Sequence, residues 1–127
     1  MLRFAILTHD HPYLHWDLLL EQAGQDSLLT WRLEKSPALG EVILAEELPG
    51  HRRIYLDYEG PVSGNRGKVR RWDAGEYERL SQMQARIEIA FLGQRVRGKA
   101  TLTRLENGKW AFEMPVGSPG NDAEPED

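Results

Sequence analysis

The sequence predicts a mainly β fold, a closed or nearly closed antiparallel β-barrel of about seven to nine short strands with one or two short helical turns. Apolar and polar residues alternate over short stretches, most clearly at Ile87, Ile89 and Phe91, as in half-buried strands. Turn residues such as Gly, Pro and Asn separate these stretches. Many short strands leave unpaired edges, so closure into a barrel or a sandwich is the expected solution.

In the first half of the chain, strands are expected where apolar residues alternate or run together, at 2–7, 16–22, 27–33 and 51–57. The turn Gly24-Gln25-Asp26 has hairpin length and separates the second strand from the third. The segment 42–48 fits either a strand or a short helix, because its apolar run is too brief to decide.

In the second half, the same patterns predict strands at 68–72, 85–92, 96–105 and 109–114. Asp73 fits the cap of a helical turn within 73–84. Asn107-Gly108 is the strongest hairpin signal in the chain. We therefore expect one barrel domain at 1–116, followed by a disordered acidic tail at 117–127.

The composition is that of a water-soluble globular domain. The 127 residues carry 16 basic and 20 acidic side chains and no cysteine, which excludes disulfides and thiolate chemistry. No apolar run approaches the roughly 18 residues that a membrane helix needs, and the N-terminus lacks a signal-peptide layout. We expect a cytoplasmic monomer that does not associate with membranes.

The most informative stretch runs from His9 to Asp17 and holds three of the four histidines. On a strand, His15 and Asp17 share one face, about 7 Å apart. His9 or His11 can fold back over them from the loop that contains Pro12. Two imidazoles and a carboxylate suit a divalent transition metal such as Mn²⁺ or Zn²⁺. The alternative is a hydrogen-bonded pair without a ligand, since the spacing matches no zinc-finger or zincin motif.

A second group of polar residues begins at His51. On a strand, His51, Arg53 and Tyr55 share a face that offers an imidazole, a guanidinium and a phenol to a phosphate. From 52 to 71 the chain carries six bases and two acids, and such a patch attracts a nucleic-acid backbone. The alternative is that these bases form only a solvated strand face.

Together these stretches resemble the 3′-phosphoesterase module of the bacterial DNA ligase D family. The resemblance covers roughly residues 4–112 and depends on the order of several short motifs. These are His9 with Leu14-His15-Trp16-Asp17 and Glu21; Trp31, Lys35 and Pro37; His51, Tyr55 and Tyr58-Glu59-Gly60; Trp72-Asp73-Ala74-Gly75; and Phe91-Leu92-Gly93 with Gly98-Lys99 and Leu102.

The resemblance implies a β-barrel with a crescent-shaped groove and a Mn²⁺-dependent phosphoesterase that trims 3′ ends in DNA repair. Such modules remove a terminal ribonucleotide and then a 3′-phosphate from DNA or DNA–RNA ends. By position, the metal ligands would be His9, His15 and Asp17. His51 and Tyr55 would contact the scissile phosphate, and Lys35 would support them. The implied partners are DNA ends and a DNA ligase or polymerase acting in trans.

Two departures from the family bear on activity. The family has a phosphate-binding arginine two residues after the metal aspartate, where this chain has Leu19, and a second arginine in the strand before His51, which has no clear match in 42–45. We expect Arg53 to compensate, because on a strand it would lie between His51 and Tyr55. Three functions remain open at this point. The chain is a metal-dependent phosphoesterase, a nucleic-acid or repair-partner binding module with little catalysis, or a structural β-domain with incidental histidines.

Overall fold

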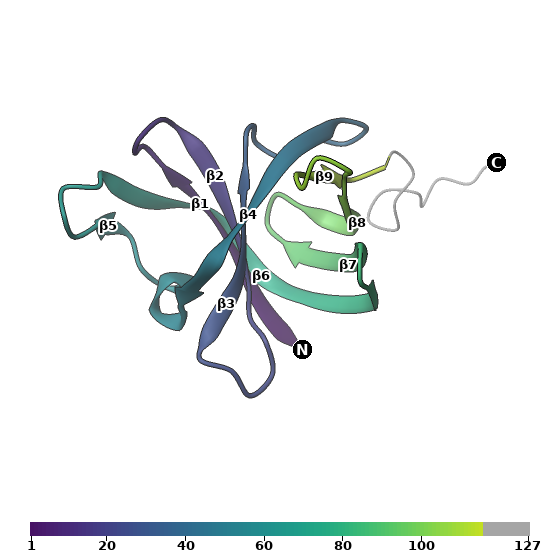
Figure 1. The fold of residues 1–127 in the computed structure, drawn as a ribbon. Helices are drawn as coiled ribbons and strands as arrows, with labels where there is room; N and C mark the ends of the chain where they lie inside the picture. Colours follow the sequence, from purple (N-terminus) through teal and green to yellow (C-terminus); the bar gives the residue numbers. More distant parts are fainter. Residues whose placement is uncertain (116–127) are drawn as a thin grey trace.

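Pairing between β6 and β1 closes the antiparallel sheet of this protein into a barrel (Figure 1). The computed structural model describes residues 1–115, and the predicted tail at 117–127 lies outside them. The strands are β1 Leu2–His9, β2 His15–Leu20, β3 Ser27–Leu33, β4 Val42–Arg52, β5 Gly60–Pro61, β6 Lys68–Met83, β7 Arg86–Gly93, β8 Arg97–Arg104 and β9 Trp110–Glu113. The ring has the order β1-β2-β3-β4-β9-β8-β7-β6, and β5 pairs with β6 outside it. The predicted barrel is confirmed.

Two hydrophobic clusters lie on opposite sides of the barrel wall. The interior cluster draws residues from every strand of the ring, for example Phe4 and Ile6 of β1. The outer cluster consists of Ala5, Leu7, Leu19, Leu28, Leu56, Val62 and Val69. Because side chains alternate along a strand, β1 and β2 are buried on both faces where the two clusters sandwich them.

The outer cluster is covered by the segment that follows β4. Here the expected strand at 51–57 is wrong: β4 ends at Arg52, and Arg53–Leu56 form a short 3₁₀ helix, η1. Leu56 is buried against the outer cluster, and Tyr55 and Tyr58 pack beside it. Burial of Leu56 on the outside of the wall requires the chain to turn out of the sheet, which a continuing strand would not allow.

The expected helical turn within 73–84 is also wrong, because β6 is one continuous strand. It pairs with β1 along one edge and with β7 along the other, and these tertiary pairings outweigh a weak local helix signal. Asp73 caps no helix. Its buried carboxylate accepts backbone N–H groups of Gln94, Arg95 and Val96, and so fixes the turn between β7 and β8. The segment 42–48, left open between strand and helix, is part of β4.

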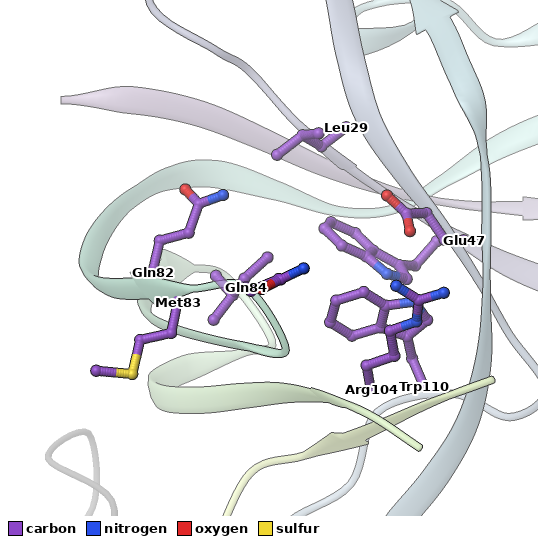
Figure 2. A pocket seen from close by; sticks show the side chains of 9 residues that line it. Leu29, Glu47, Gln82, Met83, Gln84, Arg104 and Trp110 are labelled. Atoms are coloured by element: carbon purple, nitrogen blue, oxygen red, sulfur yellow. The ribbon is translucent and has the colours of Figure 1, made fainter. Parts of the chain in front are cut away.

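The barrel interior opens at one end into a cavity of about 510 Å³ (Figure 2). Trp31 and Trp110 line it, with ring centroids 5.6 Å apart. Arg104 of β8 lies opposite Trp110, Glu47 of β4 lies opposite Trp31, and both also line the cavity. Within residues 1–115, no helix is long and apolar enough to span a membrane.

Candidate metal centre and phosphate-binding cavity

Strand alternation brings His9, His15 and Asp17 together on the outer face of the barrel wall. His9 ends β1, and His15 begins β2 directly opposite it. Asp17 lies opposite Leu7 of the outer cluster, so the three polar side chains continue that cluster's face toward the end of the two strands. One ligand atom from each residue lies within 4.8 Å of the other two.

Backbone carbonyl groups fix the two imidazoles. Nδ1 of His15 lies 2.8 Å from the carbonyl oxygen of Tyr13, and Nε2 of His9 lies 2.8 Å from that of Arg66. A carbonyl oxygen can only accept, so each of these nitrogens donates its proton. The other ring nitrogens, Nε2 of His15 and Nδ1 of His9, therefore present lone pairs in the neutral ring. They lie 3.2 and 3.5 Å from the Asp17 carboxylate oxygens.

Two atoms of this cluster are buried without a hydrogen-bond partner. They are Nε2 of His15 and Oδ1 of Asp17, in side chains that are almost completely buried. Buried polar atoms without a partner are rare, because each costs roughly 1–3 kcal/mol. A cation between the imidazoles and the carboxylate would satisfy both atoms. The donor set of two imidazole nitrogens and one carboxylate oxygen fits Mn²⁺ or Zn²⁺. The second nitrogen of each histidine is hydrogen-bonded to a backbone carbonyl, as is usual for histidine ligands of metals.

A cavity of about 360 Å³ opens beside this cluster. His9 and Asp17 line one side, and His51, Arg52 and Tyr55 line another. The cavity therefore joins the end of β4 and the helix η1 to the candidate metal ligands, although these elements are separate in sequence. The rings of His51 and Tyr55 have centroids 5.8 Å apart, and Nδ1 of His51 donates to the Pro49 carbonyl at 3.3 Å.

Some residues that the sequence singled out lie elsewhere. Arg53 does not line the cavity, because η1 directs its guanidinium to the Glu21 carboxylate, with which it forms an ion pair. Lys35 does not line it either, and its ammonium lies 3.5 Å from a Glu41 oxygen in an exposed pair. His11 is exposed and does not belong to the cluster, with its ring centroid 6.5 Å from that of His9.

Two arginines of the basic run at 52–71 also line the cavity, although their sequence positions did not single them out. Arg52, at the end of β4, and Arg66, in the turn before β6, both line it. The Arg66 side chain donates to the Ser63 carbonyl at 2.7 Å, in a turn where Gly64, Asn65 and Gly67 have positive φ. The run of bases at 52–71 was the available signal, but sequence alone does not show which of them face His51.

The loop between β1 and β2 is held against that turn. The Asp10 carboxylate accepts the backbone N–H of Lys68 at 2.9 Å, and this hydrogen bond lowers the pKa of Asp10. Gly67 allows the approach: a Cβ there would lie 2.1 Å from Oδ1 of Asp10 and 2.8 Å from Cβ of His11. The turn thus fixes the histidine loop and also supplies the carbonyl that orients His9.

Leu19 lies where the resemblance would place an arginine. It is fully buried in the outer cluster, beside Leu7 and Leu28. No cation therefore follows Asp17 on this face of β2.

Comparison with known proteins is consistent with this geometry. A family model described as the DNA Ligase D 3′-phosphoesterase domain matches residues 7–104. The multifunctional non-homologous end joining protein LigD of Pseudomonas aeruginosa is 30% identical over 114 residues, which cover 82% of this chain and 13% of that protein. The chain thus spans only a small part of the length of this relative. Because the family match extends over most of the barrel, the chain belongs to the DNA ligase D 3′-phosphoesterase domain family.

Proposed function

We propose that this protein is a metal-dependent phosphoesterase that processes DNA 3′ ends during repair, removing a 3′-ribonucleotide and a 3′-phosphate. One observation carries the proposal: the cluster of His9, His15 and Asp17 faces a cavity whose other walls present His51, Tyr55 and arginine side chains. A cation site opposed by phosphate-binding groups suits phosphoryl chemistry. Family membership supports the same assignment.

His9, His15 and Asp17 would hold the metal, and we propose Mn²⁺ as the natural ion. When bound, such an ion supplies Lewis acidity toward a phosphoryl oxygen and lowers the pKa of water. The carbonyl groups of Tyr13 and Arg66 fix the tautomer of each neutral imidazole, so the lone pair of the second ring nitrogen points toward Asp17. The neighbouring leucines of the outer cluster exclude water from this side of the site, which strengthens electrostatic interactions within it.

The residues on the far wall would bind and protonate the phosphate. Nδ1 of His51 is engaged with Pro49, so Nε2 is the nitrogen available to donate a proton to a leaving oxygen when the ring is charged. The Tyr55 hydroxyl can donate to a phosphate oxygen from η1. Arg52 and Arg66 contribute positive charge at the cavity and favour the developing negative charge of the transition state.

Arg53 and Lys35 have supporting roles in this proposal. Arg53 fixes η1, and hence Tyr55, through its ion pair with Glu21. Lys35 contributes positive charge at the surface rather than a contact in the cavity.

The proposed substrate is a DNA or DNA–RNA 3′ end. The family is that of DNA ligase D and the Pseudomonas relative is named a multifunctional non-homologous end joining protein, so we expect a DNA ligase or polymerase as the partner. Monomeric state and cytoplasmic location remain predictions.

The direct test is turnover on a short primer–template with a 3′-phosphate or one 3′ ribonucleotide, with and without Mn²⁺. We expect Mn²⁺-dependent trimming that is lost in Asp17→Asn, a variant that keeps the side-chain shape. Circular dichroism of both proteins verifies that the barrel is folded. The buried Leu19 favours a second candidate, a binding module with little catalysis. Mn²⁺ and DNA binding without turnover would select that candidate, and absence of Mn²⁺ binding would contradict the metal site itself.

A further inference from the structure

Arg32 of β3 lies directly across the β2–β3 ladder from Asp17. Residues opposite one another in an antiparallel pair share a face, with Cβ atoms about 4.5–5.5 Å apart. Arg32 is therefore on the outer face, beside the candidate metal ligands and on the side away from β1. The next pair along the ladder on this face joins Leu19 to Thr30, which carry no charge.

The guanidinium of Arg32 has an unsatisfied donor. The residue is half-buried, and its Nε is buried without a hydrogen-bond partner. Glu46 lies opposite Arg32 on β4, yet within residues 1–115 no ion pair of Arg32 is formed with it or with any other acid. A half-buried cation without an anionic partner is costly, and an anion bound at this place would relieve that cost.

Tyr13 supports Arg32 in this position. The guanidinium carbon of Arg32 lies 5.7 Å from the centroid of the Tyr13 ring, in a cation–π arrangement. The Tyr13 ring is itself 5.7 Å from the ring of His15. The Tyr13 ring therefore lies between Arg32 and His15 and connects the arginine to the metal cluster. The hydrogen bond from His15 to the Tyr13 carbonyl fixes the backbone at Tyr13.

We propose that Arg32 binds the terminal 3′-phosphate of the substrate from the β3 side of the metal cluster, outside the cavity that Arg52 and Arg66 line. This inference rests on the function proposed above and adds a residue to its phosphate site. The planar guanidinium can donate two parallel N–H groups to two phosphate oxygens. Tyr13 acts as a positioning residue for Arg32. The phosphate is then held between cations of the cavity and a cation of β3, so the position occupied by Leu19 does not need to supply one.

The test measures binding rather than turnover. Short single strands that end in a 3′-phosphate or a 3′-hydroxyl are titrated into wild type, Arg32→Gln and Arg32→Lys by fluorescence anisotropy in the absence of divalent metal, so that the 3′-phosphate is not removed during the titration. We expect Arg32→Gln to weaken binding of the 3′-phosphate strand about 10- to 100-fold, the value of one charge-assisted contact. Binding of the 3′-hydroxyl strand should change less than about two-fold, and Arg32→Lys should recover part of the loss.

Arg104→Gln is the matched control, because it removes the same charge from the mouth of the barrel interior, whose cavity shares no residue with the candidate site (Figure 2). It should leave both affinities nearly unchanged. An equal loss of affinity for both strands in Arg32→Gln would overturn the proposal, since Arg32 would then contact the upstream backbone. Unchanged affinity for both strands would also overturn it. If wild type does not distinguish the two strands, the proposed function fails, whatever Arg32 does.

Discussion

Arg53 and Glu21 form an ion pair that fastens the helix η1 to the end of β2. The other Glu21 oxygen accepts the backbone N–H of Arg3 at 2.8 Å, and the Arg3 guanidinium reaches Asp57, just after η1, at 2.5 Å. The segment that carries Tyr55 is thus tied to the barrel at both of its ends. Its position over the cavity depends on these pairs as well as on the burial of Leu56.

Removing the charge of Glu21 should loosen η1. We expect Glu21→Gln to lower the free energy of unfolding by about 1–2 kcal/mol, a value reduced by the partial exposure of Arg53. Urea unfolding measures this change. Lys35→Gln removes one partner of an exposed pair and should cost less than about 0.5 kcal/mol. Equal losses in the two variants would show that the Glu21 pair is not an anchor.

The metal cluster predicts which histidine matters for metal affinity. Asp17→Asn and His9→Ala should each weaken Mn²⁺ binding about 100-fold or more, because each removes one of only three protein donors. His11→Ala is the matched control in the same loop and should change affinity less than about two-fold, since His11 lies outside the cluster. Titration followed by electron paramagnetic resonance of free Mn²⁺ measures these affinities. If His11→Ala weakened Mn²⁺ binding strongly and His9→Ala did not, the metal ligand would be His11 and not His9.

Gly67 and Gly108 both have positive φ, 73° and 86°, but differ in their surroundings. A Cβ at Gly108 meets nothing within 4 Å, whereas one at Gly67 would collide with Asp10 and His11. Gly108→Ala should therefore cost only backbone strain, about 1–2 kcal/mol. Gly67→Ala should cost more and should also weaken Mn²⁺ binding, because it displaces the histidine loop. Thermal unfolding and Mn²⁺ titration of both variants test this, and unchanged Mn²⁺ affinity in Gly67→Ala would contradict it.

Asp57 predicts a pH dependence of stability. The hydrogen bond from Arg3 lowers the pKa of Asp57 below its ordinary value of 3.8. A depressed pKa stabilises the folded state above the unfolded-state value, and this stabilisation is lost as pH falls through the folded-state value. At pH 6, wild type should therefore have a higher melting temperature than Asp57→Asn. The difference in the free energy of unfolding should be less than about 1 kcal/mol, because the pair is exposed, and it should vanish in strong acid. A difference that persists in an Arg3→Gln background would assign it to another cause.

The barrel was predictable because its signals are local. Alternation in segments such as 85–92 and the turn at Asn107-Gly108 specify strands and hairpins without knowledge of distant partners. The candidate cluster was predictable for the same reason, since His9 and Asp17 lie on adjacent strands joined by a short loop. The helical turn predicted after Asp73 failed because the partners of β6 along this stretch, β1 and β7, include a strand far away in sequence.

Distant pairings also decided which arginines approach the site. The strand expected at 51–57 placed Arg53 beside His51, but burial of Leu56 turned the chain and left Arg52 at the cavity instead. Arg32 was not predictable, because its place beside Asp17 depends on the register of β3 against β2. A shift of one residue in that register would put it on the interior face.

The two imidazoles of the cluster are oriented by the main chain at Tyr13 and Arg66, not by side chains. Alanine scanning is therefore blind to the contacts that set the tautomers, because truncating either residue leaves its carbonyl in place. Substitutions can accumulate at both positions without rotating a ligand, as long as the backbone path is kept. An ester in place of the peptide bond that follows each residue weakens the carbonyl as a hydrogen-bond acceptor. This backbone change would test whether the two carbonyl groups orient the imidazoles.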